Sequence, residues 1–238
     1  MNFFLEAIGW IFDGSHYGGV NGIDTRILQH LLISVEVLVV SAVIAIPVGY
    51  LVGHTGRGRT LTVALSGGVR ALPTLGLMII LALVLGIGLE APFIAFVVLA
   101  VPSVLAGAYA GFEAIDRSTI DASRSVGMTQ WQTLTKVEVP LGLPLLIGGL
   151  RSASLQVIST VTLADYVGAG GLGHFLFLGL KTNDYPQMLA GSIVVIVLAM
   201  LSEVVFSVLQ RIVVPAGVSA GSVQVVRTRP LRSRSTLG

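Results

Sequence analysis

Long apolar runs are the feature that most limits how this chain can fold. The hydrocarbon core of a bilayer is about 30 Å thick, and a helix crosses it with about 20 apolar residues. Runs of this length lie at 30–52, about 71–89, 92–112, 141 to about 163, and 188–214. Charged residues make up only 11% of the chain, against about a quarter in soluble domains. The sequence therefore predicts an all-α membrane protein with about five transmembrane helices.

The second apolar run is the least regular of these. Residues 61–69, just before it, are also apolar, but they are followed by Arg70 and Pro73. Proline lacks a backbone N–H and disrupts the interior of a helix. Two arrangements remain open: either 61–69 is an interfacial lead-in, or it forms the first turns of a longer helix that is broken at Pro73.

The cations between the predicted spans indicate their orientation, because Lys and Arg collect in cytoplasmic loops. Only Arg26 and Lys181 fall in the loops on one side. The loops and tail on the other side carry the following residues: Arg57, Arg59, Arg117, Arg124, Lys136, Arg211, Arg227, Arg229, Arg232 and Arg234. We therefore predict that the N-terminus lies outside and the C-terminus in the cytoplasm.

Two flanking segments complete the predicted organisation. Residues 1–29 form an extracytoplasmic N-terminal segment in which 2–12 is an interfacial helix or partial span, or else a disordered terminus with a few apolar residues. The membrane domain covers 30–214. Residues 215–238 are rich in Arg, Ser and Thr and form a predicted disordered tail, whose cations either attract anionic lipid or only help to fix the topology.

Two glycine-rich motifs imitate nucleotide-binding loops. Residues 53–60 have the glycine spacing of a P-loop, but Arg59 replaces its lysine and an apolar run precedes it in place of a strand. Residues 168–173 satisfy the dinucleotide fingerprint outside any βαβ unit. The first is better explained as a flexible basic turn, and the second as a tight turn or a close helix contact.

Catalytic and metal-binding residues form no recognisable group in the sequence. The chain has no cysteine, and His16, His30, His54 and His174 lie far apart. We therefore expect a chain that is not an enzyme, with no metal site and no cofactor of its own. The shortage of charge also argues against nucleic-acid binding.

Residues 113–140 form the longest polar segment between two predicted spans, and they are built to form a helix. Several small or apolar residues fall on one face at helical spacing: Ile120, Ala122, Ser123, Val126 and Gly127. Asp116, Asp121 and Arg124 add charge. Gly127 can adopt the left-handed conformation that ends a helix. Such a helix either docks into a groove on a partner or anchors the loop at the membrane surface.

The same loop resembles a known family. Asp121-Ala122-Ser123, three residues, Gly127, nine residues and then Val137-Glu138-Val139-Pro140 are similar to the E-A-A, x3, G, x9, I-x-L-P signature of permease subunits in ATP-binding cassette importers. The spacing matches throughout, with conservative replacements at Asp121, Ser123, Val137 and Val139.

Three further segments resemble the osmoprotectant branch of that family, whose substrates include glycine betaine, choline and carnitine. They are Leu72-Pro73-Thr74, the residues 127–131, and the residues 163–173. The resemblance covers roughly 30–211. It is the combination of the three segments that points to this branch.

The resemblance implies a type I importer fold and a set of partners. The coupling loop would dock on a separate ATPase subunit through Asp121, Ala122, Ser123, Gly127, Val137 and Pro140. ATP and Mg²⁺ would be bound by that ATPase. An extracytoplasmic binding protein would deliver the substrate, and a second permease subunit, identical or different, would complete the path in the cytoplasmic membrane of a prokaryote.

Polar residues within the apolar runs are candidates for the translocation path, because buried charge in a membrane is costly and usually functional. These candidates are Glu36, Arg151 and Glu203, together with Pro73 at the irregular second run. A structural ion pair of Arg151 with Glu113 or Glu203 is the favoured alternative. Few aromatic residues lie in the runs, so an aromatic cage for a quaternary amine is expected on the binding protein.

Three other functions remain as alternatives. An ion-coupled secondary transporter or channel would use a broken helix such as the one suggested by Arg70 and Pro73, but it has no need of the loop signature. An importer permease for a different small solute, such as an amino acid, would share the signature. A membrane-embedded enzyme would need catalytic groups clustered at one depth.

Overall fold

The computed structural model describes residues 2–213, and its secondary structure within that range consists of helices joined by turns and loops. The α-helices are α1 (Phe3–Phe12), α2 (Ile23–Thr55), α3 (Arg59–Arg70), α4 (Thr74–Leu85), α5 (Glu90–Glu113), α6 (Arg117–Ser125), α7 (Gln130–Thr133), α8 (Val139–Val161), α9 (Gly173–Thr182) and α10 (Tyr185–Val213). Short helical turns η1 (Gly14–His16), η2 (Leu134–Glu138) and η3 (Thr162–Val167) join some of them. The predicted tail, 215–238, lies outside the described residues.

Four stretches in the described part are long and apolar enough to cross a membrane. They are α2, α5, the continuous helical stretch Gln130–Val167 that contains α8, and α10. Helices α3 and α4 pass the same test only together, and they meet at a bend of 86°. The four stretches together with this bent pair agree with the prediction of about five spans, and the helix is interrupted at Pro73, where the sequence indicated a possible break.

The first span begins earlier than the apolar pattern suggested, at Ile23 instead of His30. The charge of Arg26 hid this extra length. In the structure Arg26 is largely buried and donates hydrogen bonds to Asn21 (2.6 Å) and Gln29 (3.1 Å). Because both terminal nitrogens of its guanidinium find partners on the protein, the helix can continue through a charged residue.

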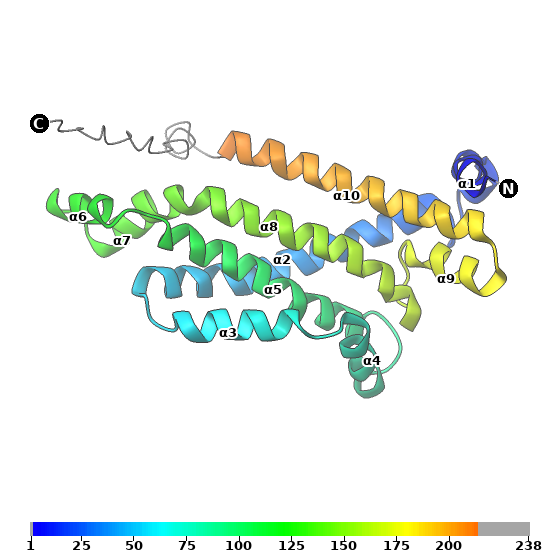
Figure 1. Cartoon of the computed structure of the whole chain (residues 1–238), viewed down its shortest axis with the longest axis horizontal. Coiled ribbons are helices and arrows are strands. Elements are labelled where there is room, and N and C mark those ends of the chain that lie inside the picture. The colour runs from blue at the N-terminus through cyan, green and yellow to red at the C-terminus, as the bar shows by residue number, and fades with distance from the viewer. Residues whose placement is uncertain (1, 214–238) are drawn as a thin grey trace, which may run out of the picture.

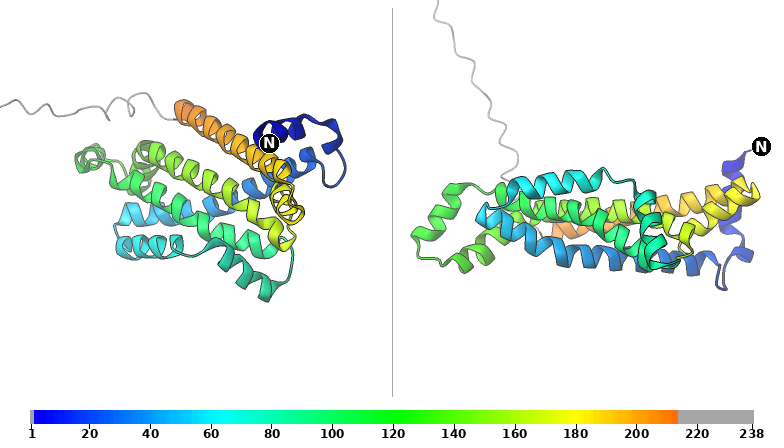
Figure 2. Two further views of the ribbon diagram at one scale, coloured as in Figure 1. Left: turned by 45° about the vertical axis from the view of Figure 1, so that its right-hand side comes forward. Right: turned by 90° about the horizontal axis from the view of Figure 1, so that it is seen from below.

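The long helices run side by side in one elongated bundle (Figure 1). Helices α2, α5 and α8 form its centre, α3 lies along α5, and α10 packs on α8 and α9. Helices α6 and α7 lie at one end, and α1 and α9 at the other, as Figure 2 also shows. The described chain starts at the α1–α9 end and α10 finishes toward the α6–α7 end, so the two ends of the described chain lie at opposite ends of the bundle. Which end faces the cytoplasm stays a prediction.

Glycines allow the central helices to approach closely. A Cβ atom placed on Gly107 of α5 would lie 2.7 Å from Cα of Gly149 on α8, and one on Gly111 would lie 2.6 Å from the carbonyl oxygen of Gly142. Helix contacts in membranes depend on such small residues, because lipid provides no hydrophobic force between helices. Gly107 and Gly111 therefore place α5 against α8 backbone to backbone.

The glycine-rich segment 168–173 folds over the start of α2. Gly168, Gly170 and Gly171 have φ between +79° and +86°, and the N–H of Leu172 donates to Nδ1 of the buried His30 (3.3 Å). The segment is thus a tight turn in close contact with α2, as the sequence suggested.

A small charged cluster fixes this turn. Asp165 lies 3.9 Å from Arg26 and 3.7 Å from His174. Burial lowers the pKa of His174 below its ordinary value, and the charge of Arg26 lowers it further. The imidazole is therefore neutral near pH 7, and Arg26 is the positive partner of Asp165.

Helix α1 packs on the same end. The ring of Phe3 lies 5.6 Å from that of Tyr185, and Trp10 contacts Phe175 edge to face at 5.2 Å. The N-terminal segment therefore forms a helix attached to α9 and α10, while its position relative to the membrane stays a prediction.

Candidate functional site

The polar loop predicted to carry the function forms a projecting hairpin, made of α6, α7 and the turn between them. It extends beyond the ends of the long helices (Figure 1). Asp116 caps the start of α6, because its side chain accepts a hydrogen bond from the N–H of Ser118 at 2.9 Å. This hydrogen bond lowers the pKa of Asp116, so the cap remains charged at neutral pH. The prediction of a separate helix in this loop is confirmed.

Gly127 ends α6 as predicted. Its φ is +84°, in the left-handed region. Its N–H donates to the carbonyl of Arg124 (2.9 Å), and the N–H of Met128 donates to that of Ser123 (3.2 Å). These bonds close the last turn of the helix and set the direction in which the chain returns to the bundle.

Side-chain hydrogen bonds hold α6 against α7. The hydroxyls of Ser123 and Thr133 lie 3.3 Å apart, and both residues are buried. Thr129 and Gln132 form a reciprocal capping box at the start of α7, which satisfies two backbone N–H groups that the helix leaves free. The hairpin is therefore built as a unit with a fixed internal shape.

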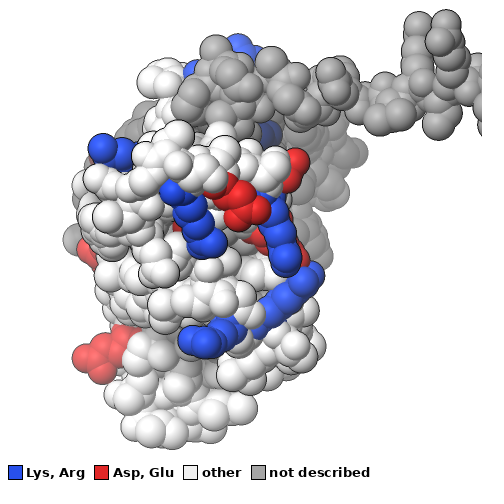
Figure 3. Space-filling model, turned by 90° about the vertical axis from the view of Figure 1, so that its left-hand side faces the viewer, with Lys and Arg blue, Asp and Glu red and all other residues white. Residues whose placement is uncertain are grey.

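The outer surface of the hairpin carries apolar side chains beside charged ones. Val126 is 75% exposed and Trp131 is 71% exposed, while Asp121, Ala122 and Arg124 are also exposed. Figure 3 looks onto this end of the molecule and shows basic and acidic side chains intermixed. Exposed apolar residues at the tip of a rigid projection, flanked by both signs of charge, are suited to docking on another protein.

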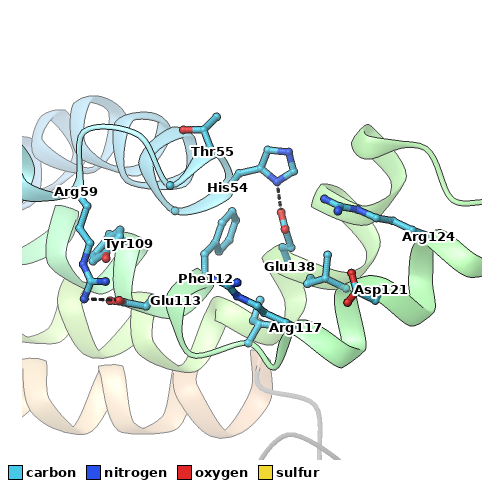
Figure 4. Close-up of a pocket in the computed structure, with 14 residues that line it drawn as sticks. His54, Thr55, Arg59, Tyr109, Phe112, Glu113, Arg117, Asp121, Arg124 and Glu138 are labelled. Atoms are coloured by element: carbon cyan, nitrogen blue, oxygen red, sulfur yellow. Dashed lines mark hydrogen bonds and ion pairs between the residues drawn. The ribbon is translucent and has the colours of Figure 1, made fainter.

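A cavity of about 600 Å³ separates the hairpin from the ends of α2 and α5. Figure 4 shows that its walls come from α2, α3, α5 and α6. The charged and ionisable side chains around it are His54, Arg59, Glu113, Arg117, Asp121, Arg124 and Glu138. Arg59 and Glu113 form an ion pair of 2.5 Å. Because cations and carboxylates balance, the cavity has no strong preference for ligands of either charge.

One charged hydrogen bond ties the returning chain to α2. Nδ1 of His54 lies 2.5 Å from Oε2 of Glu138, as drawn in Figure 4. Glu138 is 6% exposed and ends the π-helical turn Leu134–Glu138, a type of turn that is frequent at functional sites. The sequence gives no signal for this pair, because 84 residues separate its members.

We expect Glu138→Ala to destabilise the protein and to weaken the connection between α2 and the turn η2, through which the hairpin returns to the bundle. Removal of one partner leaves the other polar group largely buried without a hydrogen bond, at a cost of about 1–3 kcal/mol. A double-mutant cycle with His54→Ala, followed by thermal unfolding in detergent, measures the interaction. Strict additivity of the two single effects would contradict a direct link.

The residues predicted as candidates for the translocation path lie on different helices and do not form one group. Arg151 of α8 and Glu203 of α10 are paired, with Nε of the arginine 2.6 Å from Oε2 of the carboxylate. The expected structural pairing is thus observed for Glu203, whereas Glu113 pairs with Arg59. Glu36 is exposed on α2, and Pro73 lies at the break between α3 and α4. A role of any of them in a translocation path stays a prediction.

Residues 2–213 contain no cluster of three or more His, Asp or Glu residues arranged to hold a metal ion.

Val137 and Pro140 of the signature lie where η2 joins α8, so the signature spans the hairpin and its connection to the bundle.

Comparisons with known proteins agree with this geometry. The chain is 29% identical to the glycine betaine/carnitine/choline transport system permease protein OpuCB of Bacillus subtilis, over 79% of this chain and 87% of that protein. It is 30% identical to the carnitine transport permease protein OpuCB of Listeria monocytogenes, over 80% and 87%. A solved structure of the MetNI methionine ABC transporter in an inward-facing conformation contains a chain with the same fold, with a TM-score of 0.69, 23% identity, and coverage of 80% of this chain and 95% of that one.

The family model for the inner membrane component of binding-protein-dependent transport systems matches residues 45–216. This range contains the hairpin, the broken span and the α5–α8 contact. The chain therefore belongs to this family, the membrane permease subunits of ATP-binding cassette importers.

Proposed function

We propose that this chain forms the translocation path for an osmoprotectant-like quaternary amine in the cytoplasmic membrane of a prokaryote. An extracytoplasmic binding protein delivers the solute, and a second permease subunit completes the path. ATP and Mg²⁺ are bound by a separate ATPase. The α6–α7 end of the bundle faces the cytoplasm, in agreement with the distribution of Lys and Arg.

The observation that carries the proposal is the projecting hairpin. Its signature residues Asp121, Ala122, Ser123 and Gly127 form or end α6, and Val126 and Trp131 expose apolar surface beside them. A hairpin with fixed internal hydrogen bonds transmits force without deforming. Docking on an ATPase gives this surface a partner, whereas an ion-coupled transporter or channel leaves it without a role.

The substrate class is supported by the relatives. The two OpuCB proteins are described as permeases for glycine betaine, carnitine and choline and for carnitine. The bend between α3 and α4 and the 163–173 turn lie within residues 45–216, the range that the family model matches. The likeness to the methionine transporter concerns the fold alone. An importer for a different small solute, such as an amino acid, is the remaining alternative.

The transport test uses the complete importer in proteoliposomes, with the binding protein outside and ATP inside. We expect ATP-dependent accumulation of labelled glycine betaine or choline, and none when the binding protein is omitted. Accumulation of amino acids with no uptake of either quaternary amine would overturn the proposed substrate class while leaving the importer function intact.

A second test addresses the docking surface directly by cysteine crosslinking. Because the chain has no native cysteine, an introduced cysteine is the only thiol of the subunit. We expect Val126→Cys to form a crosslink to a cysteine in the groove of the ATPase, and Val20→Cys, an exposed position near the α1–α9 end, to form none. A preparation that transports solute without any crosslink from Val126→Cys would contradict docking through α6.

The purified subunit alone should hydrolyse no ATP.

A further inference from the structure

An arginine without an acidic partner in the described residues lies where α3 ends, at the bend between α3 and α4. Arg70 is the last residue of α3 and is exposed. Within residues 2–213 it makes no ion pair, and one of its terminal nitrogens (Nη2) lies 3.4 Å from the hydroxyl of Ser103 on α5. A guanidinium has five N–H donors, so most of them remain available.

The length of α3 places Arg70 at about half the depth of a membrane core, measured from Arg59. Arg70 follows Arg59 by eleven positions in a continuous helix, and Arg59 pairs with Glu113 at the end of α5. At 1.5 Å per residue the separation along α3 is about 16 Å, half of a core about 30 Å thick. A cation at this depth faces a protein interior or water rather than lipid.

A chain of hydrogen bonds holds this arginine in place. Ser103 accepts from Arg70 and donates to Oε1 of Gln156 on α8 (3.1 Å), whose amide nitrogen in turn donates to the carbonyl of Leu99 (3.2 Å). Ser103 is 4% exposed. Three helices therefore contribute polar groups at one depth. Polar groups inside a membrane cost free energy, and where they occur they are usually functional.

The surroundings of Arg70 can accommodate a small solute. A cavity of about 370 Å³ runs between α3 and α5 and is lined by Thr62, Ser66, Gly67, Arg70, Ala106 and Tyr109, among others. Its size falls within the range of small-molecule sites. Beyond the break, α4 begins at Thr74 without a side-chain cap. The free N–H groups of a half-helix favour anionic groups of a substrate.

The guanidinium of Arg70 is the only charged group that lines this cavity, and it favours negative charge, whereas a quaternary ammonium group is positive. We infer that Arg70, held by Ser103 and Gln156, binds the carboxylate of the transported solute at mid-membrane, so that the path favours quaternary amines that carry a carboxylate over those that do not. Glycine betaine and carnitine carry this group, and choline does not. Tyr109 offers a single aromatic ring, which is consistent with weak contact to the ammonium group. The inference rests on the proposed function and specifies its substrate.

The test compares Arg70→Gln with wild type in the complete importer, with one unchanged binding protein. We expect the ratio of glycine betaine import to choline import to fall at least fivefold, because only glycine betaine loses its partner. Arg70→Lys keeps the charge and should retain a larger share of the ratio. Arg59→Gln is the matched control, an arginine on the same helix, and should alter both imports by the same factor.

The outcomes separate this inference from the proposed function. If Arg70→Gln lowers both imports equally, or if wild type imports choline but no carboxylated amine, the carboxylate site is wrong and the proposed function stands. If wild type imports glycine betaine alone, a fivefold loss in Arg70→Gln that Arg59→Gln does not show supports the site, and equal losses overturn it. If no quaternary amine is imported, both fall.

Discussion

Gly127→Val should reduce ATP-dependent uptake by at least tenfold while the protein still inserts and folds. Valine at a φ of +84° is strained by about 1–3 kcal/mol, and a β-branched side chain is especially unsuited to this region. The turn relieves the strain by changing its dihedral angles, which tilts α6 relative to the bundle. The measurement is uptake in proteoliposomes together with stimulation of ATP hydrolysis by the loaded binding protein.

The structure separates this effect from general destabilisation. A Cβ atom on Gly127 would have no neighbour within 4 Å, so the cost comes from the backbone and not from a clash. Gly127→Asn is the matched control, because asparagine tolerates the left-handed region. This chain already uses Asn183 at φ 58° to end α9. Equal loss of uptake in the Val and Asn variants would show that the backbone conformation is not what matters.

Gly149→Val should have the largest effect on stability. Its new Cβ would lie 2.8 Å from Cα of Gly107 and 2.9 Å from the carbonyl oxygen of Ser103. Both neighbours are backbone atoms that cannot rotate away, so α8 must separate from α5. Overpacking costs about 1–3 kcal/mol where side chains can adjust, and we expect at least about 3 kcal/mol here. Thermal unfolding in detergent should show a decrease in Tm of roughly 6–12 °C.

The adjacent Gly148 provides the control for that variant. It is exposed on the same helix, and a Cβ atom there would meet nothing within 4 Å. Gly148→Val introduces the same side chain with the same helix propensity, and should change the Tm little. If both variants unfolded at the same temperature, the close contact of α5 and α8 would not be the source of stability that the structure indicates.

Much of the fold was predictable because membrane solvation leaves a strong signal in the sequence. A span must satisfy its backbone internally and cover itself with apolar side chains, so 92–112 and 188–214 closely match α5 and α10. The helix within the loop 113–140 and its end at Gly127 were equally readable. Their signals are local: small and apolar residues at helical spacing, and a glycine that can end the helix.

The interactions that needed the tertiary structure join residues that are distant in the chain. His54 and Glu138 are 84 positions apart, and Arg70 and Ser103 are 33 apart. Hydropathy describes one segment at a time, so it registers Arg26 and Arg70 only as interruptions. Whether such a charge ends a span, forms a pair or faces a cavity depends on which helices lie beside it.

Sequence alone therefore determined the membrane class, the approximate number of spans, the position of the α6 helix and the likeness to importer permeases. These properties follow from local periodicity and from motifs at fixed spacing. The tertiary structure decided the 86° break of the second span, the backbone contact of α5 with α8, the choice of Glu203 as the partner of Arg151, and the exposed charge of Arg70. Each of these depends on the distance between helices, and that distance is set by packing of the whole bundle.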